Sequence, residues 1–159
     1  MLTAAKSEER EAKSEKITRF LVLSFSLFAF SFRLVCADGP ASQHFQTGLA
    51  YERLGRYEEA YTELQLAFAL DQDDAPMAVA LGVVACRLSR WDVAQRAFER
   101  SVSVDSGSVA SYYHLALIYE KNNQTDRALD AWHRFSSLNQ DDVLKGIAQK
   151  HIQYLETRG

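Results

Sequence analysis

The chain has few of the features that mark a disulfide-rich domain or an enzyme. Its 159 residues include only two cysteines, Cys36 and Cys86, which are too few for a disulfide framework. It has no glycine-rich phosphate loop and no nucleophile elbow. No two of its four histidines have the i, i+4 spacing that metal sites on helices often use. We therefore expect no catalytic site, no metal site and no cofactor.

The body of the chain also lacks an excess of positive charge. Residues 38–159 hold 12 of the 18 Lys and Arg residues and 17 of the 21 Asp and Glu residues, so this part is mildly acidic. A nucleic-acid backbone is bound through a basic stripe or patch. We therefore do not expect nucleic acid as a partner.

The chain has no apolar run of the length that crosses a membrane comfortably. Residues 20–32, FLVLSFSLFAFSF, form an apolar run of 13 residues, whereas a spanning helix needs about 20. This is the length of the central segment of a secretory signal, basic residues precede it, and Val35 and Ala37 suit signal peptidase. We predict that residues 1–37 are a signal peptide cleaved after Ala37, or a membrane anchor retained through residues 20–32. A helix that packs on the body is the third alternative.

What the chain does contain is a repeat with a period of 34 residues. Such a period in a helical sequence is typical of stacked helix–turn–helix units, because one unit cannot bury its apolar face alone. Three sets of residues keep this spacing: Ala60, Ala94 and Ala128; Gly48, Gly82 and Ala116; and Leu70, Val104 and Leu138.

Each unit is expected to form two helices of about 14 residues, near 41–54 and 57–70 in the first unit. Gly55 suits the end of a helix, and Asp74 and Ser108 are placed to cap the helices that follow them. A short linker at residues 38–40 precedes the array, and the units follow without a gap as residues 41–74, 75–108 and 109–142.

Residues 143–159 are predicted to form an amphipathic helix that caps the open end of the stack, as solenoids require. Asp141 or Asp142 can cap its N-terminus. Apolar residues recur at helical spacing along one face of this segment: Leu144, Ile147, Ala148, Ile152 and Leu155.

The pattern within each unit resembles the tetratricopeptide repeat. This family has small residues at positions 8, 20 and 27, as Gly48, Ala60 and Ala67 are in the first unit, so that the two helices pack closely. The chain departs from the family at His44 and Thr47, where large apolar residues are usual, at Phe135, which takes the small position 27 of the third unit, and at position 32, where the usual proline is absent from all three units. The resemblance implies an all-α fold, a right-handed superhelical α-solenoid of three helix–turn–helix repeats with a C-terminal capping helix.

The resemblance also implies a binding surface, since the first helices of this family line a concave groove. Family repeats that grip a chaperone's C-terminal carboxylate have Lys and Asn where Phe45 and Leu49 stand, so we do not expect capture of a charged tail. The groove positions give a mostly apolar floor with charge at one edge: Phe45, Gln46, Leu49, Glu52, Val79, Val83, Cys86, Tyr113, His114 and Leu117.

We therefore expect a non-enzymatic scaffold or adaptor that binds a partner peptide or helix with an apolar or amphipathic segment. The leader favours an exported protein, periplasmic or secreted, or one held at a membrane through residues 20–32. Two alternatives stay open. The groove could pack against other parts of the same chain, or the protein could be a cytosolic chaperone for a hydrophobic secretion substrate. The oligomeric state is not predicted.

Overall fold

The computed structural model describes residues 39–157, which form seven helices and no strand. The predicted leader, residues 1–37, lies outside the described residues, so its cleavage or retention stays a prediction. In chain order the helices are α2 (Pro40–Arg53), α3 (Tyr57–Leu70), α4 (Ala75–Arg87), α5 (Trp91–Val104), α6 (Val109–Lys121), α7 (Thr125–Leu138) and α8 (Asp142–Glu156).

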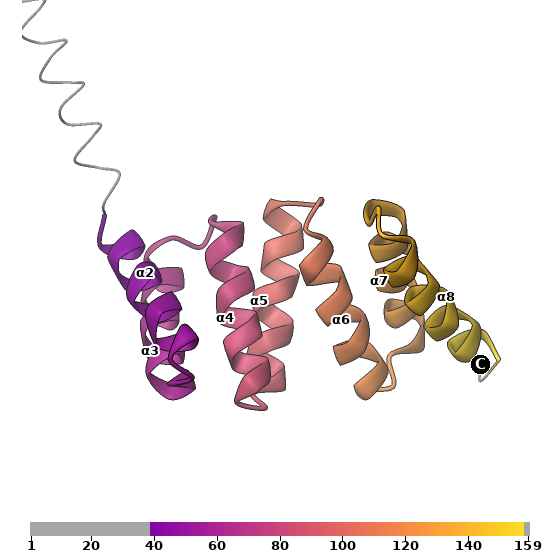
Figure 1. Cartoon of the computed structure of the whole chain (residues 1–159), viewed down its shortest axis with the longest axis horizontal. Coiled ribbons are helices and arrows are strands. Elements are labelled where there is room, and N and C mark those ends of the chain that lie inside the picture. Colours follow the sequence, from indigo (N-terminus) through magenta and orange to yellow (C-terminus); the bar gives the residue numbers. More distant parts are fainter. Residues whose placement is uncertain (1–38, 158–159) are drawn as a thin grey trace, which may run out of the picture. The chain divides into compact units, whose positions relative to one another are not determined.

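The first six helices form three hairpins, in which α2 packs on α3, α4 on α5 and α6 on α7. The second helix of one hairpin packs on the first helix of the next, α3 on α4 and α5 on α6, and α8 packs on α7 in the same way. Figure 1 shows these helices following one another in chain order, from α2 in indigo to α8 in yellow. The predicted fold class, an all-α solenoid of helix–turn–helix repeats with a capping helix, is confirmed.

The turn inside each hairpin places a left-handed residue at the same position of the repeat. Gly55, Ser89 and Asn123 have φ angles of 73°, 57° and 54°, and they stand 34 residues apart. Glycine adopts this conformation without a Cβ penalty, and asparagine tolerates it better than most residues. The conformation recurs although the residue type changes, so the hairpin geometry repeats more closely than the sequence.

The helix starts agree with the predicted caps at two places and differ at a third. The Asp74 carboxylate accepts the Met77 N–H of α4 at 2.8 Å, and Asp141 accepts the N–H groups at the start of α8. Ser108 precedes α6 but caps no N–H; its hydroxyl instead donates to the hydroxyl of Ser111 at 2.9 Å. Ser111 in turn donates to Ser101, so these hydroxyls satisfy one another at the seam between α5 and α6.

The core lies between the two helices of each hairpin. Ala60, Ala94 and Ala128 are all completely buried, as their shared register predicts. A Cβ atom on Gly48 would lie 2.7 Å from Cγ of Leu64, and one on Gly82 would lie 2.7 Å from the ring of Phe98. The absence of a side chain at these two positions therefore allows the helices to approach closely.

Helix α8 buries Ala148, Ile152 and Leu155, in agreement with the predicted apolar face. Leu144 and Ile147, which the pattern placed on the same face, are 38% and 39% exposed. These two side chains are only partly covered, because α8 is the last described helix and no further described helix packs beyond it.

Candidate functional site

An open hollow of about 430 Å³ lies between the first helices of the first two hairpins, α2 and α4. It brings together five of the ten predicted groove residues, and their role in binding stays a prediction. The lining consists of Phe45, Leu49, Glu52, Ala75, Pro76, Val79, Ala80, Val83, Asp105 and Ser108.

Helical spacing places the side chains of this hollow. On α2, Phe45, Leu49 and Glu52 are separated by four and three residues, so they lie along one side of the helix. On α4, Val79 and Val83 are separated by one turn and face the same space. All five are half-buried, because each packs on the core and still has an open side. The result is an apolar surface that water reaches.

Two predicted groove residues of the third hairpin pack largely against their own chain. The ring of Tyr113 meets Trp132 edge-on at 5.8 Å and lies 5.4 Å from the ring of Phe135. The His114 ring stacks on Phe98 of the previous hairpin at 4.8 Å. Burial lowers the pKa of His114, and the positive charge of Arg87 lowers it further. Neither Tyr113 nor His114 lines the hollow between α2 and α4.

The remaining predicted residues lie in other surroundings. Gln46 is exposed on α2, and Cys86 is half-buried near the end of α4. Burial raises the pKa of the Cys86 thiol, an effect that Arg87 only partly opposes, so the thiol is not activated. Leu117 lines a second, more polar hollow of about 530 Å³ with Glu120, Lys121 and residues of α8.

The two glutamates at position 12 of the first and third repeats have different surroundings. Glu120 accepts a hydrogen bond from the Trp132 indole N–H and lies 2.9 Å from Nδ1 of His151 on α8. Glu52, 68 residues earlier, makes no hydrogen bond or ion pair with any other described residue. The residue that corresponds to Trp132 is Leu64, which has no donor. The first hairpin therefore leaves a half-buried carboxylate without a partner.

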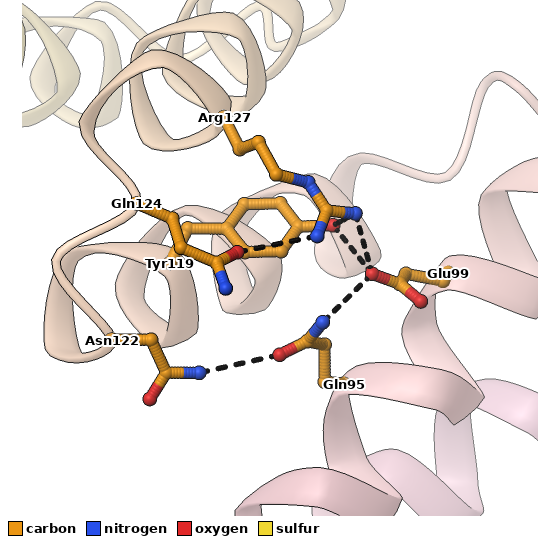
Figure 2. A network of polar contacts seen from close by, with 6 residues as sticks. All are labelled: Gln95, Glu99, Tyr119, Asn122, Gln124 and Arg127. Atoms are coloured by element: carbon orange, nitrogen blue, oxygen red, sulfur yellow. Dashed lines mark hydrogen bonds and ion pairs between the residues drawn. The ribbon is translucent and has the colours of Figure 1, made fainter.

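A polar network joins the second hairpin to the third (Figure 2). Glu99 accepts hydrogen bonds from Gln95 at 2.9 Å, from the Tyr119 hydroxyl at 2.9 Å and from Arg127 at 2.7 Å. The Arg127 guanidinium also lies over the Tyr119 ring, 4.2 Å from its centre. Burial raises the pKa of Glu99, but the three hydrogen bonds and the Arg127 charge outweigh burial and lower it overall.

Sequence reasoning missed this network, and only a weak signal for it exists. Gln95 and Glu99 are one helical turn apart, which indicates a local pair, but Tyr119 and Arg127 follow 20 and 28 residues after Glu99. A single sequence does not pair residues at such separations. The network links α5 to α6 and α7, and so ties the second hairpin to the third.

Among residues 39–157, no group of three or more His, Cys, Asp or Glu side chains is placed to hold a metal ion. None of the helices α2 to α8 combines the length and the apolar character that crossing a membrane needs.

Stacked helix hairpins with one partly open apolar face define the class of helical-repeat solenoids. Residues 44–74 and residues 110–139 each match a family model of the tetratricopeptide repeat. These two segments are tetratricopeptide repeats, in agreement with the resemblance that the sequence pattern indicated.

Solved structures of other proteins share this fold at low sequence identity. The Yersinia enterocolitica type III secretion chaperone SycD, in complex with a peptide of the translocator YopD, has a TM-score of 0.66 and 16% identity. That match covers 74% of this chain and 92% of SycD. The Arabidopsis OM64 TPR domain has a TM-score of 0.64 and 16% identity, over 72% of this chain and 94% of that domain. At these identities the likeness shows the fold alone.

A curated human protein is similar to part of this chain. Protein O-mannosyl-transferase TMTC1 is 34% identical over 84 residues, which are 53% of this chain and 10% of that protein. The chain therefore spans about a tenth of the length of this relative.

Proposed function

We propose that the chain is a non-enzymatic adaptor that binds an apolar or amphipathic peptide or helix of a partner protein. The binding surface is the hollow between α2 and α4, and this hollow is the observation on which the proposal depends. Phe45, Leu49 and Val83 each keep an open side there, so a bound segment would remove apolar surface from water at three adjacent points.

The proteins with similar folds support a peptide partner. SycD is bound to a peptide of YopD, PcrH to the chaperone-binding region of PopD, and the first TPR domain of Spaghetti to the HSP90 peptide SRMEEVD. The acidic HSP90 peptide is a poor guide to the ligand of this chain, because Phe45 and Leu49 offer it no positive charge. We therefore propose an apolar segment as the ligand.

Capture of partner proteins by matched variants tests this function. Leu49→Glu and Val83→Glu each place a charge in the hollow, and we expect both to abolish capture while the helical circular dichroism spectrum persists. Leu66→Glu is the control, because Leu66 is 44% exposed on α3 and does not line the hollow. Capture that survives both groove variants, or that Leu66→Glu abolishes equally, would contradict the proposal.

We also propose that the protein acts outside the cytoplasm, after export or while held at a membrane. The support is the sequence of the leader, in which basic residues precede a 13-residue apolar run and Ala37 follows it. Mass spectrometry of the mature protein tests this location. A mature N-terminus at Asp38, or an intact chain in the membrane fraction, is expected. An intact Met1 in a soluble protein would instead favour the cytosolic chaperone for a secretion substrate.

A further inference from the structure

The hollow between α2 and α4 carries charge of one sign. Two carboxylates line it, Glu52 on α2 and Asp105 in the turn before α6, and no Lys or Arg is among its lining residues. The carboxylate of Asp105 accepts the N–H of Gly107 at 2.9 Å within its own turn. Glu52 has no such partner among the described residues, although it is half-buried. The carboxylate of Glu52 therefore lies in a mostly apolar hollow without a cation or a hydrogen-bond donor from the described residues.

Binding of a purely apolar segment would carry a desolvation cost at the Glu52 carboxylate. The segment would remove water from the carboxylate without replacing its hydrogen bonds, and an unpaired carboxylate in an apolar environment is costly. The third repeat shows how the chain avoids this cost at Glu120, where Trp132 and His151 supply the donors. In the first repeat the donor has to come from the ligand.

The positively charged side chains nearest to Glu52 in sequence do not remove this need. Arg53 follows Glu52 directly on α2, and Arg87 ends α4. Both are exposed, neither lines the hollow, and neither forms an ion pair with a described residue. They leave the lining of the hollow acidic.

We infer that the segment bound in the hollow carries a Lys or Arg side chain beside its apolar residues, and that this cation pairs with Glu52. The inference rests on the proposed function and names the chemistry of its ligand. Glu52 is then the residue that determines specificity, since the apolar floor accepts many apolar segments and the carboxylate selects those with a nearby positive charge.

Selection from a random peptide library tests this inference on the full chain. The peptides to be counted are those whose binding Leu49→Glu abolishes, because these bind in the hollow. We expect Lys and Arg to be enriched among peptides selected on the wild-type chain and not among those selected on Glu52→Gln. Glu156→Gln is the matched control, because Glu156 is an exposed residue at the end of α8 and its loss leaves the hollow intact.

Affinities of one selected peptide give the size of the effect. Replacing its basic residue by Glu should weaken binding to the wild-type chain about tenfold, measured by fluorescence anisotropy. The same replacement should change binding to Glu52→Gln by about twofold or less. Leu49-dependent binding without any preference for Lys or Arg would overturn this inference and leave the proposed function standing. If no peptide binds in a Leu49-dependent way, both are overturned.

Discussion

The first and third hairpins follow the same 34-residue pattern, yet their inner faces differ. In the third hairpin Tyr113 lies against Trp132 and Phe135, and Glu120 is hydrogen-bonded. The equivalent residues of the first hairpin, Phe45 and Glu52, border an open hollow. Two positions of the second helix account for the difference.

These two positions change in size along the chain. Position 24 is Leu64, then Phe98, then Trp132, and position 27 is alanine, then serine, then Phe135. The larger aromatic residues of the third repeat reach the first helix and provide both packing and an indole N–H donor. The repeat pattern therefore specifies the stack, while the residue sizes within it decide whether the side chain at position 5 is packed, as Tyr113 is, or borders an open hollow, as Phe45 does.

The largest expected effect is the loss of Trp132, which is completely buried. Trp132→Ala should lower the free energy of unfolding by about 3–5 kcal/mol, because it leaves a large cavity in the third hairpin. It should also expose α8 to hydrogen exchange, since His151 stacks on the Trp132 ring at 4.5 Å. Urea unfolding followed by circular dichroism measures the stability. A loss below about 1 kcal/mol would contradict the role of Trp132 in filling the space between α6 and α7.

A smaller effect is expected at Gly82, in the hairpin between the two regions. Gly82→Ala places a Cβ 2.7 Å from the buried Phe98 ring, which cannot move freely, so we expect a loss of about 1–2 kcal/mol. Gly146 of α8 is the control, because a Cβ there meets nothing within 4 Å. Gly146→Ala should raise stability by about 0.5–1 kcal/mol through helix propensity. In thermal or urea unfolding, Gly82→Ala should lower the free energy of unfolding and Gly146→Ala should raise it. A change of the same sign in both variants would contradict the close approach of Gly82 to the Phe98 ring.

Glu52 and Glu120, at position 12 of the first and third repeats, should contribute differently to the free energy of unfolding. Glu120→Gln weakens the charge-assisted hydrogen bonds to Trp132 and His151, so we expect a loss of about 1–2 kcal/mol. Glu52→Gln removes a charge that no described residue pairs, and the change should stay within about 0.5 kcal/mol. Equal losses in urea unfolding would show that Glu52 has a partner within the chain.

The smallest expected effect is a pH dependence at His114, where the second and third hairpins meet. Burial and Arg87 lower the pKa of His114 in the folded chain, whereas the unfolded value is about 6.5. Between these two pKa values the unfolded state binds the proton more readily, so stability falls as the pH is lowered through about 6.5. His114→Gln should reduce this dependence, measured by urea unfolding at several pH values. An unchanged pH profile would contradict a lowered pKa of His114 in the folded chain.

Much of the fold could be predicted from the sequence because close packing constrains single positions. The alanines at 60, 94 and 128 and the glycines at 48 and 82 mark helix contacts that no larger residue fits, so their spacing reveals the stack. Local signals such as Asp74 and Pro76 indicate a helix start, because the capped N–H group of Met77 is only three residues from Asp74.

The site was harder to predict because its state depends on residues distant in sequence. The register places Phe45 and Tyr113 at the same position, and only the neighbours on the second helix separate an open side chain from a packed one. Phe135 was one of several visible departures from the pattern, and it is part of the cluster around Tyr113. Contacts such as Glu99 with Arg127 join different hairpins, and no local pattern indicates them.

Hydrogen exchange of the full chain, with and without a peptide selected for binding that depends on Leu49, tests most directly whether the open first half is the binding region. We predict slower exchange in α2 and α4, around residues 45–52 and 79–83, and little change in α8. Slower exchange centred on residues 142–156, or on α3 and α5 without α2 and α4, would contradict the account.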